Sequence, residues 1–189
     1  VGEIREKHLV TVKEAVAEEF RSLTIIEIEK LCEELEKALI GVSYVGELTP
    51  RSMDYLISFG EKLNAPIVSG ALNSAEIKSR WYDGFSAGII TNSDFGKASP
   101  IWKDTKKKVM DVLKPILSSS VPVVTGFIAG DEKGRIATLG RGGSDYTAAI
   151  LGSALGVEEI WIWTDVNGIM TTDPKLVKEA RTINVISFI

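Results

Sequence analysis

The sequence predicts an α/β protein built around a parallel sheet. An apolar run at residues 121–128 is followed by a glycine-rich loop, a helical pattern from residue 144 and a second apolar run at residues 159–163. Strand, loop, helix and strand in this order form a βαβ unit, which joins parallel strands. Continuous apolar runs are typical of strands that are buried on both faces. Polar residues follow the predicted strands, and ligands bind at such strand ends in open parallel sheets.

Composition restricts the classes of protein to which the chain can belong. The 189 residues are 44% hydrophobic and 25% charged, which fits one soluble globular domain. The formal net charge of -4 indicates no nucleic-acid partner, and no apolar run is long enough to indicate a membrane span. Cys32 is the only cysteine and His8 the only histidine. We therefore expect a cytoplasmic protein without a metal site built on Cys and His.

The first part of the chain is expected to be helical. Apolar residues at helical spacing predict one helix over residues 3–20 and another over residues 24–40. Together they would form an antiparallel hairpin at about residues 1–40, which is either architectural or covers a partner surface. Thr49 and Pro50 mark the start of a third helix that runs to about residue 70, because a threonine N-cap followed by proline is a favoured helix start.

Within this third helix, the pair Gly60 and Glu61 is unusual. A glycine inside a helix costs roughly 1 kcal/mol relative to alanine, so Gly60 predicts that another backbone or a ligand approaches closely. Glu61 would then lie where it can accept hydrogen bonds from a cationic group. The alternative is an ordinary exposed glutamate on a helix.

The second part of the chain alternates between strands, turns and helices. The predicted elements are extended segments within residues 76–91 including a strand at 88–91, a turn at 92–96, a helix at 103–117 that Pro115 should end, the buried strand at 121–128, a hairpin turn at 130–134 and an extended segment at 136–139.

The residues most indicative of function come next. They are Gly140, Arg141, Gly142 and Gly143, followed by Ser144 and Asp145. The glycines leave a backbone whose N–H groups can approach a ligand closely. Ser144 is a good N-cap, so the loop should end in a helix whose N-terminus attracts anions. The guanidinium of Arg141 suits a carboxylate or a phosphate, and Asp145 adds one acidic group.

The alternative is an ordinary glycine-rich turn before a helix. The crowding of Arg, Ser and Asp into the loop disfavours it, as does a second polar stretch at residues 164–168. The sequence has no G-x-x-x-x-G-K-[ST] motif, and the G-R-G-G-S-D block does not match the G-x-G-x-x-G fingerprint. We therefore predict an anion site that is neither a P-loop nor a dinucleotide site.

Four stretches of the chain resemble signature motifs of aspartate kinases, which belong to the amino-acid-kinase superfamily. In the expected order, they are residues 58–63 (SFGEKL), 124–128 (VTGFI), 138–149 (TLGRGGSDYTAA) and 163–174 (WTDVNGIMTTDP). The resemblance runs through most of the chain from about residue 41. The G-R-G-G-S-D block is specific, because relatives such as acetylglutamate, glutamate 5- and UMP kinases carry other residues there.

The resemblance implies a three-layer αβα sandwich with a mostly parallel sheet, of which residues 1–189 would be a partial catalytic domain. It also implies transfer of the γ-phosphoryl group of ATP to the β-carboxylate of L-aspartate, with Mg²⁺ at the phosphates. This reaction opens the pathway to lysine, threonine and methionine. The family's first strand and its C-terminal ACT domains have no counterpart in this sequence. We therefore expect unpaired sheet edges and a homo-oligomer.

The resemblance further implies roles for individual residues. Glu61 would hold the ammonium group of aspartate, while Arg141 and Ser144 would bind its carboxylates. Phe127 would pack at the substrate, and Asp145, the catalytic residue, would organise the donors around the phosphates. Gly142 and Gly143 would also lie at the substrate. The residues expected at the nucleotide are Gly140, Thr164, Asp165, Met170 and Lys175. Met170 and Lys175 stand where the family commonly has Tyr and Arg. These roles suit a zwitterion, which needs an acceptor for its ammonium and a cationic fork for a carboxylate.

Two alternatives stay open on the sequence. The first is another carboxylate or carbamate kinase of the same superfamily. The second is a non-catalytic fragment that binds aspartate or a nucleotide. A purely structural domain is disfavoured, because the polar clusters at the predicted strand ends serve no purpose in packing.

The family's K-F-G-G-[ST]-S loop supplies a lysine that neutralises the transferring phosphoryl group, and this sequence does not contain it. We therefore predict that these 189 residues alone have little or no kinase activity. A coupled assay of ADP release measures this, and turnover close to that of a full-length relative would show the prediction to be wrong.

Overall fold

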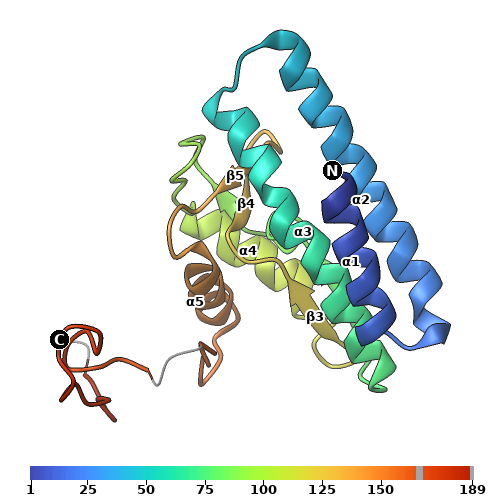
Figure 1. Cartoon of the computed structure of the whole chain (residues 1–189). Coiled ribbons are helices and arrows are strands. Elements are labelled where there is room, and N and C mark those ends of the chain that lie inside the picture. Colours follow the sequence, from blue (N-terminus) through green and yellow to red (C-terminus); the bar gives the residue numbers. More distant parts are fainter. Residues whose placement is uncertain (165–167, 188–189) are drawn as a thin grey trace.

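The computed structural model describes residues 1–164 and 168–187 (Figure 1). Its elements are α1 (Gly2–Ala15), α2 (Glu18–Val45), α3 (Pro50–Ser74), β1 (Ser79–Tyr82), β2 (Ile90–Thr91), α4 (Trp102–Leu113), β3 (Val121–Val124), β4 (Ile128–Asp131), β5 (Ile136–Thr138) and α5 (Gly143–Leu155). None of the helices formed by the described residues combines the length and apolar character that crossing a bilayer requires.

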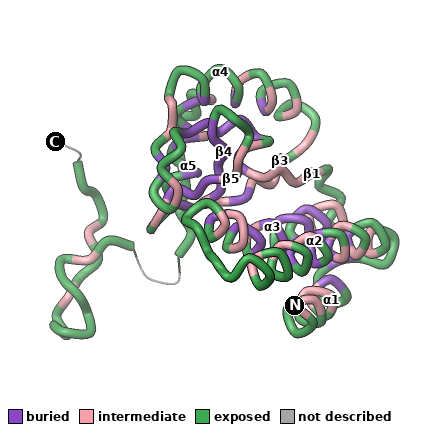
Figure 2. The backbone as a smooth tube through the Cα atoms, turned by 90° about the horizontal axis from the view of Figure 1, so that it is seen from above, coloured by how far each residue is buried: buried purple, intermediate pink, exposed green. Residues whose placement is uncertain are grey.

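The strands form two small sheets in which parallel pairing predominates. β1 pairs in parallel with β3, and β2 pairs in parallel with β4, whereas β4 and β5 form an antiparallel hairpin. α3 packs against β1, β3 and β5, while α4 contacts β2 and α5. Figure 2 shows α1, α2 and α3 on one side of the strands and α4 on the other. This layering confirms the predicted α/β class, an αβα sandwich with mostly parallel strands.

The described residues form three hydrophobic clusters, one of which, made of Ile89, Ala129, Leu139 and Ile150, joins α5 to the sheet of β2, β4 and β5. The cluster between the three N-terminal helices consists of Val12, Val16, Ile28, Leu31, Cys32, Leu35, Phe59, Leu63 and Ile67. The third, between α4, α5 and the loop before β2, consists of Ala87, Val109, Leu113 and Ala154. Because α3 contributes to the first cluster and also contacts the strands, it fixes the helical layer to the sheets.

Several predicted element boundaries are confirmed. Thr49 caps α3, since its Oγ1 accepts a hydrogen bond from the backbone N–H of Ser52 at 3.1 Å, and Pro50 is the first residue of the helix. α4 ends at Leu113, before Pro115. The first predicted helix is shorter than expected: α1 ends at Ala15, because Val16 is extended with φ -114° and ψ 128°.

The predicted strand at residues 159–163 is wrong. These residues are irregular, and Trp161 and Trp163 are 70% and 85% exposed. A strand is stable only when neighbouring strands satisfy its backbone hydrogen-bonding groups. In the described part of the chain no strand pairs with this segment. An apolar run indicates a strand, but pairing decides whether the strand forms.

The apolar run at residues 121–128 does not form one strand either. β3 ends at Val124 and β4 begins at Ile128, because the chain turns at Phe127, which has a left-handed φ of 66°. This conformation is rare for a residue with a large side chain. The predicted burial of residues 121–124 on both faces is wrong, because β3 is exposed at Val121 and only half-buried elsewhere. β4 is buried throughout, and it includes Gly130 and Asp131, which were predicted to lie in a turn. The break therefore places Phe127 in a turn rather than within a strand.

The predicted close approach of another backbone at Gly60 is wrong, and it is Gly70 on the same helix that neighbouring side chains approach closely. Among the described residues, no neighbouring atom lies within 4 Å of a Cβ built on Gly60. A Cβ on Gly70 would lie 2.8 Å from Oγ1 of Thr24 and 3.1 Å from Cγ2 of Val16. Both partners are buried and β-branched, so neither can move aside easily. Gly70 thus sets how closely α3 packs on α2 and the end of α1.

We predict opposite effects of the same substitution at these two glycines. Gly60→Ala should stabilise the protein by about 0.5–1 kcal/mol, because it removes backbone freedom from the unfolded chain without steric cost. Gly70→Ala should destabilise it by about 1 kcal/mol or more through overpacking. Urea unfolding of the two variants measures the difference, and equal effects would contradict this account of α3 packing.

Asp131 stabilises the β4–β5 hairpin. Its buried carboxylate accepts hydrogen bonds from Nε of Arg135 at 2.7 Å, from the backbone N–H groups of Arg135 at 2.9 Å and Lys133 at 3.0 Å, and from Oγ of Ser93 at 3.0 Å. Burial acts to raise the pKa of this carboxyl, but the hydrogen bonds, led by those from Arg135, outweigh it. They hold the pKa at about 2, below the ordinary value of 3.8.

A pKa lowered on folding stabilises the native protein above the unfolded pKa of 3.8, and this contribution is lost as the pH falls toward 2. We predict that Asp131→Asn lowers the free energy of unfolding by about 2 kcal/mol at pH 7. The difference from the unmodified protein should shrink below about pH 4. Urea titrations at several pH values measure this, with Asp94→Asn at an exposed position as the control. A difference that does not change with pH would refute the assignment.

Candidate functional site

A cleft of about 340 Å³ opens where the glycine-rich loop meets α3 and the turn after β3. It is lined by Glu61, Phe127, Gly140, Arg141, Gly142, Gly143, Ser144 and Asp145. Glu61 comes from α3 and Phe127 from the turn between β3 and β4, while the others belong to the loop after β5 and the first turn of α5. The structure thus brings together all the residues that the sequence assigns to the substrate, along with Gly140 and Asp145.

The glycine-rich loop takes its shape from left-handed backbone conformations. Gly140 has a φ of 76° and Gly142 a φ of 72°, which glycine adopts without a steric penalty. Gly142 is therefore the N-cap of α5. The predicted N-cap, Ser144, is wrong, because Ser144 lies inside the first turn and the helix has no side-chain cap. The first N–H groups of a helix have no acceptor within it, so the start of α5 still favours an anion in the cleft.

Two glycines let the turn after β3 press against the start of α5. A Cβ on Gly126 would lie 2.5 Å from Oγ of Ser144, and one on Gly143 would lie 2.8 Å from Cδ2 of Phe127. Thr147 links the same segments: its Oγ1 accepts from the N–H of Phe127 at 3.0 Å and donates to the carbonyl of Gly143 at 2.8 Å. These contacts fix Phe127 relative to the first turn of α5.

The cleft presents opposite charges from different elements. Glu61 is half-buried on α3, and Arg141 is exposed on the loop. Among the described residues neither forms an ion pair. A carboxylate accepts hydrogen bonds from an ammonium group, and a guanidinium donates two parallel hydrogen bonds to a carboxylate. The arrangement can therefore bind a small molecule that carries both a cationic and an anionic group.

The residues that the sequence assigns to the nucleotide are not brought together in this way. Thr164, Met170 and Lys175 do not line the cleft, and Asp165 lies outside the described residues. Met170 forms an antiparallel bridge with Thr182. Figures 1 and 2 both show residues 168–187 lying apart from α5. Of the residues assigned to the nucleotide, Gly140 alone lines the cleft in the described part of the chain.

Sequence reasoning missed two residues that support the cleft, Thr147 and Asp54. Thr147 faces Phe127 as described above, and Asp54 is a buried carboxylate on α3 that binds Thr138, at the end of β5. The sequence holds a signal for Asp54: it precedes Glu61 by about two helical turns, so the two side chains share one face of α3. A second acidic residue on the face of α3 that carries Glu61 is therefore the signal by which Asp54 could have been found.

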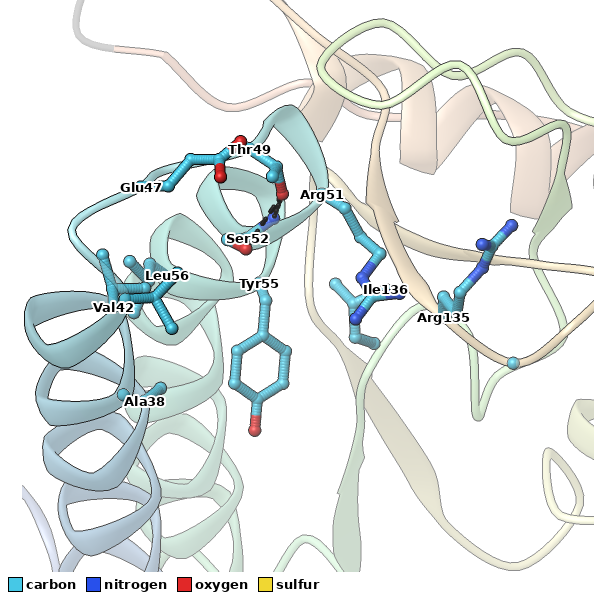
Figure 3. A pocket seen from close by; sticks show the side chains of 13 residues that line it. Ala38, Val42, Glu47, Thr49, Arg51, Ser52, Tyr55, Leu56, Arg135 and Ile136 are labelled. Carbon is cyan, nitrogen blue, oxygen red and sulfur yellow. Dashed lines mark hydrogen bonds between the residues drawn. The ribbon is translucent and has the colours of Figure 1, made fainter.

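A larger hollow of about 600 Å³ lies between the end of α2, the start of α3 and the β4–β5 turn (Figure 3). Much of its wall is apolar, including Val42, Leu56 and Ile136, and Arg135 at its edge is already paired with Asp131. Ligand sites are recognised by convergent polar groups rather than by volume alone. The larger hollow also carries opposite charges, on Glu47 and Arg51, but the smaller cleft adds the backbone of the glycine-rich loop and is therefore the candidate functional site.

Comparisons with known proteins identify the family to which the chain belongs. The sequence pattern of the Amino acid kinase family matches residues 5–189. The chain belongs to the amino acid kinase family. Among its relatives, Aspartokinase 1, chloroplastic, of Arabidopsis thaliana is 39% identical over 196 residues, which cover 98% of this chain and 32% of the relative. Lysine-sensitive aspartokinase 3 of Escherichia coli (strain K12) is 37% identical over 161 residues, covering 82% of this chain and 36% of the relative.

Solved structures of the same family share the fold. The crystal structure of E. coli aspartokinase III in complex with aspartate and ADP matches with a TM-score of 0.72 and 31% identity, covering 95% of this chain and 44% of that chain. The complex of the same enzyme with lysine and aspartate matches with a TM-score of 0.68 and 32% identity. The chain spans about a third of the length of its plant relative.

Proposed function

We propose that this protein is an aspartate kinase, which transfers the γ-phosphoryl group of ATP to the β-carboxylate of L-aspartate. The observation that carries the proposal is the cleft, in which Glu61 and Arg141 present opposite charges beside a glycine-rich loop. The similarity to plant and bacterial aspartokinases supports it, as does the similarity to an enzyme whose structure holds aspartate and ADP.

The cleft residues suit the groups of L-aspartate. Glu61 accepts hydrogen bonds from the ammonium group, and Arg141 donates a bidentate pair to one carboxylate. Ser144, with N–H groups of the first turn of α5, donates to the other carboxylate. Phe127, held by Thr147, packs against the carbon chain and excludes water from one side. Gly142 and Gly143 allow the substrate to approach the backbone closely.

Phosphoryl transfer depends on positioning and on stabilisation of charge rather than on a covalent intermediate. The backbone around Gly140 and the start of α5 favour the anionic phosphates, and Asp145 orients the donors around them. If bound, Mg²⁺ would supply positive charge that stabilises the phosphates, and it would need few protein ligands for this. We include Thr164, Asp165, Met170 and Lys175 as nucleotide contacts on the basis of the sequence motifs alone.

The competing function is that of another carboxylate kinase of the family. Glu61 discriminates between the two classes of substrate. A free amino acid places an ammonium group against this carboxylate, whereas an N-acetylated amino acid has no positive charge there and leaves the carboxylate without a cationic partner. The charge of Glu61 therefore favours L-aspartate over N-acetylglutamate.

Isothermal titration calorimetry of the 189-residue protein tests the proposal. We predict that L-aspartate binds and N-acetyl-L-glutamate does not. Glu61→Gln and Arg141→Gln should each weaken aspartate binding about tenfold or more, because hydrogen bonds between charged groups contribute about 1.5–3 kcal/mol. Arg141→Lys should recover part of this loss, since it keeps the charge but not the fork.

Glu47→Gln and Arg51→Gln are the matched controls, because both residues line the larger hollow instead. Neither should change aspartate affinity by more than about twofold. Two results would overturn the proposal: tighter binding of N-acetyl-L-glutamate than of L-aspartate, or loss of aspartate binding in the control variants but not in the cleft variants.

A further inference from the structure

Asp54 is a buried carboxylate outside the cleft. It is 1% exposed. Its Oδ2 accepts hydrogen bonds from the backbone N–H groups of Gly96 at 2.8 Å and Thr138 at 2.9 Å, and its Oδ1 accepts one from the hydroxyl of Thr138 at 2.8 Å. Within the described residues no lysine or arginine forms an ion pair with it. Three neutral donors from two distant segments therefore satisfy a charge that α3 carries into the interior.

Packing alone does not explain this arrangement. Removing a carboxylate from water is costly, and an apolar side chain would attach α3 to the sheet without that cost. What the carboxylate adds is geometry. Hydrogen bonds fix distance and direction, whereas apolar contacts tolerate small sliding movements. Asp54 therefore fixes where the end of β5 and the turn at Gly96 lie relative to α3.

The two segments that Asp54 binds both adjoin the glycine-rich loop. Thr138 ends β5, directly before the loop. The carbonyl oxygen of Gly96 lies 3.2 Å from the position that a Cβ on Gly140 would occupy, and the N–H of Ala98 donates to the carbonyl of Thr138 at 2.8 Å. The first glycine of the loop thus rests against the turn that Asp54 holds.

On the other side of the same contact lies α3, which carries Glu61 about two turns beyond Asp54. A helix is stiff over two turns, so a hydrogen bond at Asp54 also sets the position of Glu61. The glycine-rich loop that follows Thr138 carries Arg141, three residues after Thr138 in the sequence. Asp54 therefore links the helix that carries Glu61 to the base of the loop that carries Arg141.

We propose that Asp54 is a positioning residue that sets the separation between Glu61 and Arg141 and so determines affinity for a zwitterionic substrate. This rests on the proposed function, in which these two residues bind the ends of L-aspartate. Asp54 itself touches no substrate. It acts by holding the base of the glycine-rich loop against the helix that carries Glu61.

The test uses four variants of the 189-residue protein. Asp54→Ala removes the network, and Thr138→Val removes only the hydroxyl donor. Asp54→Asn is the conservative variant, because its oxygen can accept from both N–H groups while its NH₂ donates to the hydroxyl of Thr138. Thr105→Val is the matched control: Thr105 is equally buried and its Oγ1 bonds to the backbone of Ile90, but it lies on α4 and does not line the cleft.

Two measurements are made on each variant, the Kd for L-aspartate by calorimetry and the amide hydrogen exchange of residues 138–143 without ligand. We expect Asp54→Ala to weaken binding about tenfold and Thr138→Val about threefold, with faster exchange in both. Asp54→Asn should stay within about threefold of the unmodified protein. Thr105→Val should lower the Tm but leave both loop exchange and Kd unchanged.

The two proposals fail in different ways. If the unmodified protein binds no L-aspartate, the proposed function is wrong, and loop exchange still tests whether Asp54 positions the loop. The positioning role is refuted if Thr105→Val weakens binding as much as Asp54→Ala or Thr138→Val does at equal loss of Tm. It is also refuted if loop exchange is unchanged in Thr138→Val and, where it folds, in Asp54→Ala. Should Asp54→Ala not fold, the milder Thr138→Val carries the test, with Asp54→Asn as the variant that should keep the loop in place.

Discussion

The cleft depends on two backbone segments that meet with almost no side chain between them. Gly126 packs on Ser144, and Gly143 packs on Phe127, at distances that exclude a Cβ from either glycine. This contact holds Phe127 at a left-handed φ of 66°, which costs of order 1–3 kcal/mol for a residue with a side chain. The hydrogen bond from its N–H to Thr147 offsets part of that cost. The same turn separates β3 from β4 and contributes Phe127 to the wall of the cleft.

The electrostatic design of the cleft follows from which elements carry its charges. Glu61 lies on α3, a long helix anchored in the hydrophobic cluster of the N-terminal helices, whereas Arg141 lies on a loop shaped by left-handed glycines. A molecule with two opposite charges binds well only if both partners stay at a fixed separation. The hydrogen bonds of Asp54 couple α3 to the base of the loop. They therefore act on the separation between Glu61 and Arg141.

Features that depend on neighbouring residues in the chain were predictable. The start of α3 at Thr49 and Pro50 follows from local capping chemistry, and the end of α4 before Pro115 follows from the geometry of proline. Features that depend on distant partners were not. The apolar residues 159–163 have strand character, but no strand of the described residues pairs with them. Gly60 had the sequence context of a packing glycine, but Thr24 and Val16 lie opposite Gly70 instead.

By itself, the sequence determined the α/β class, the membership of a kinase family and the set of residues that line the cleft, because periodicity and motif chemistry are written in contiguous stretches. Only the tertiary structure decided that Gly142 rather than Ser144 caps α5, that Gly126 and Gly143 bring two segments into contact, and that Asp54 holds the base of the loop. The physical reason is that hydrogen bonds and close packing join residues far apart in the chain, and the spacing of residues along a sequence carries no record of such contacts.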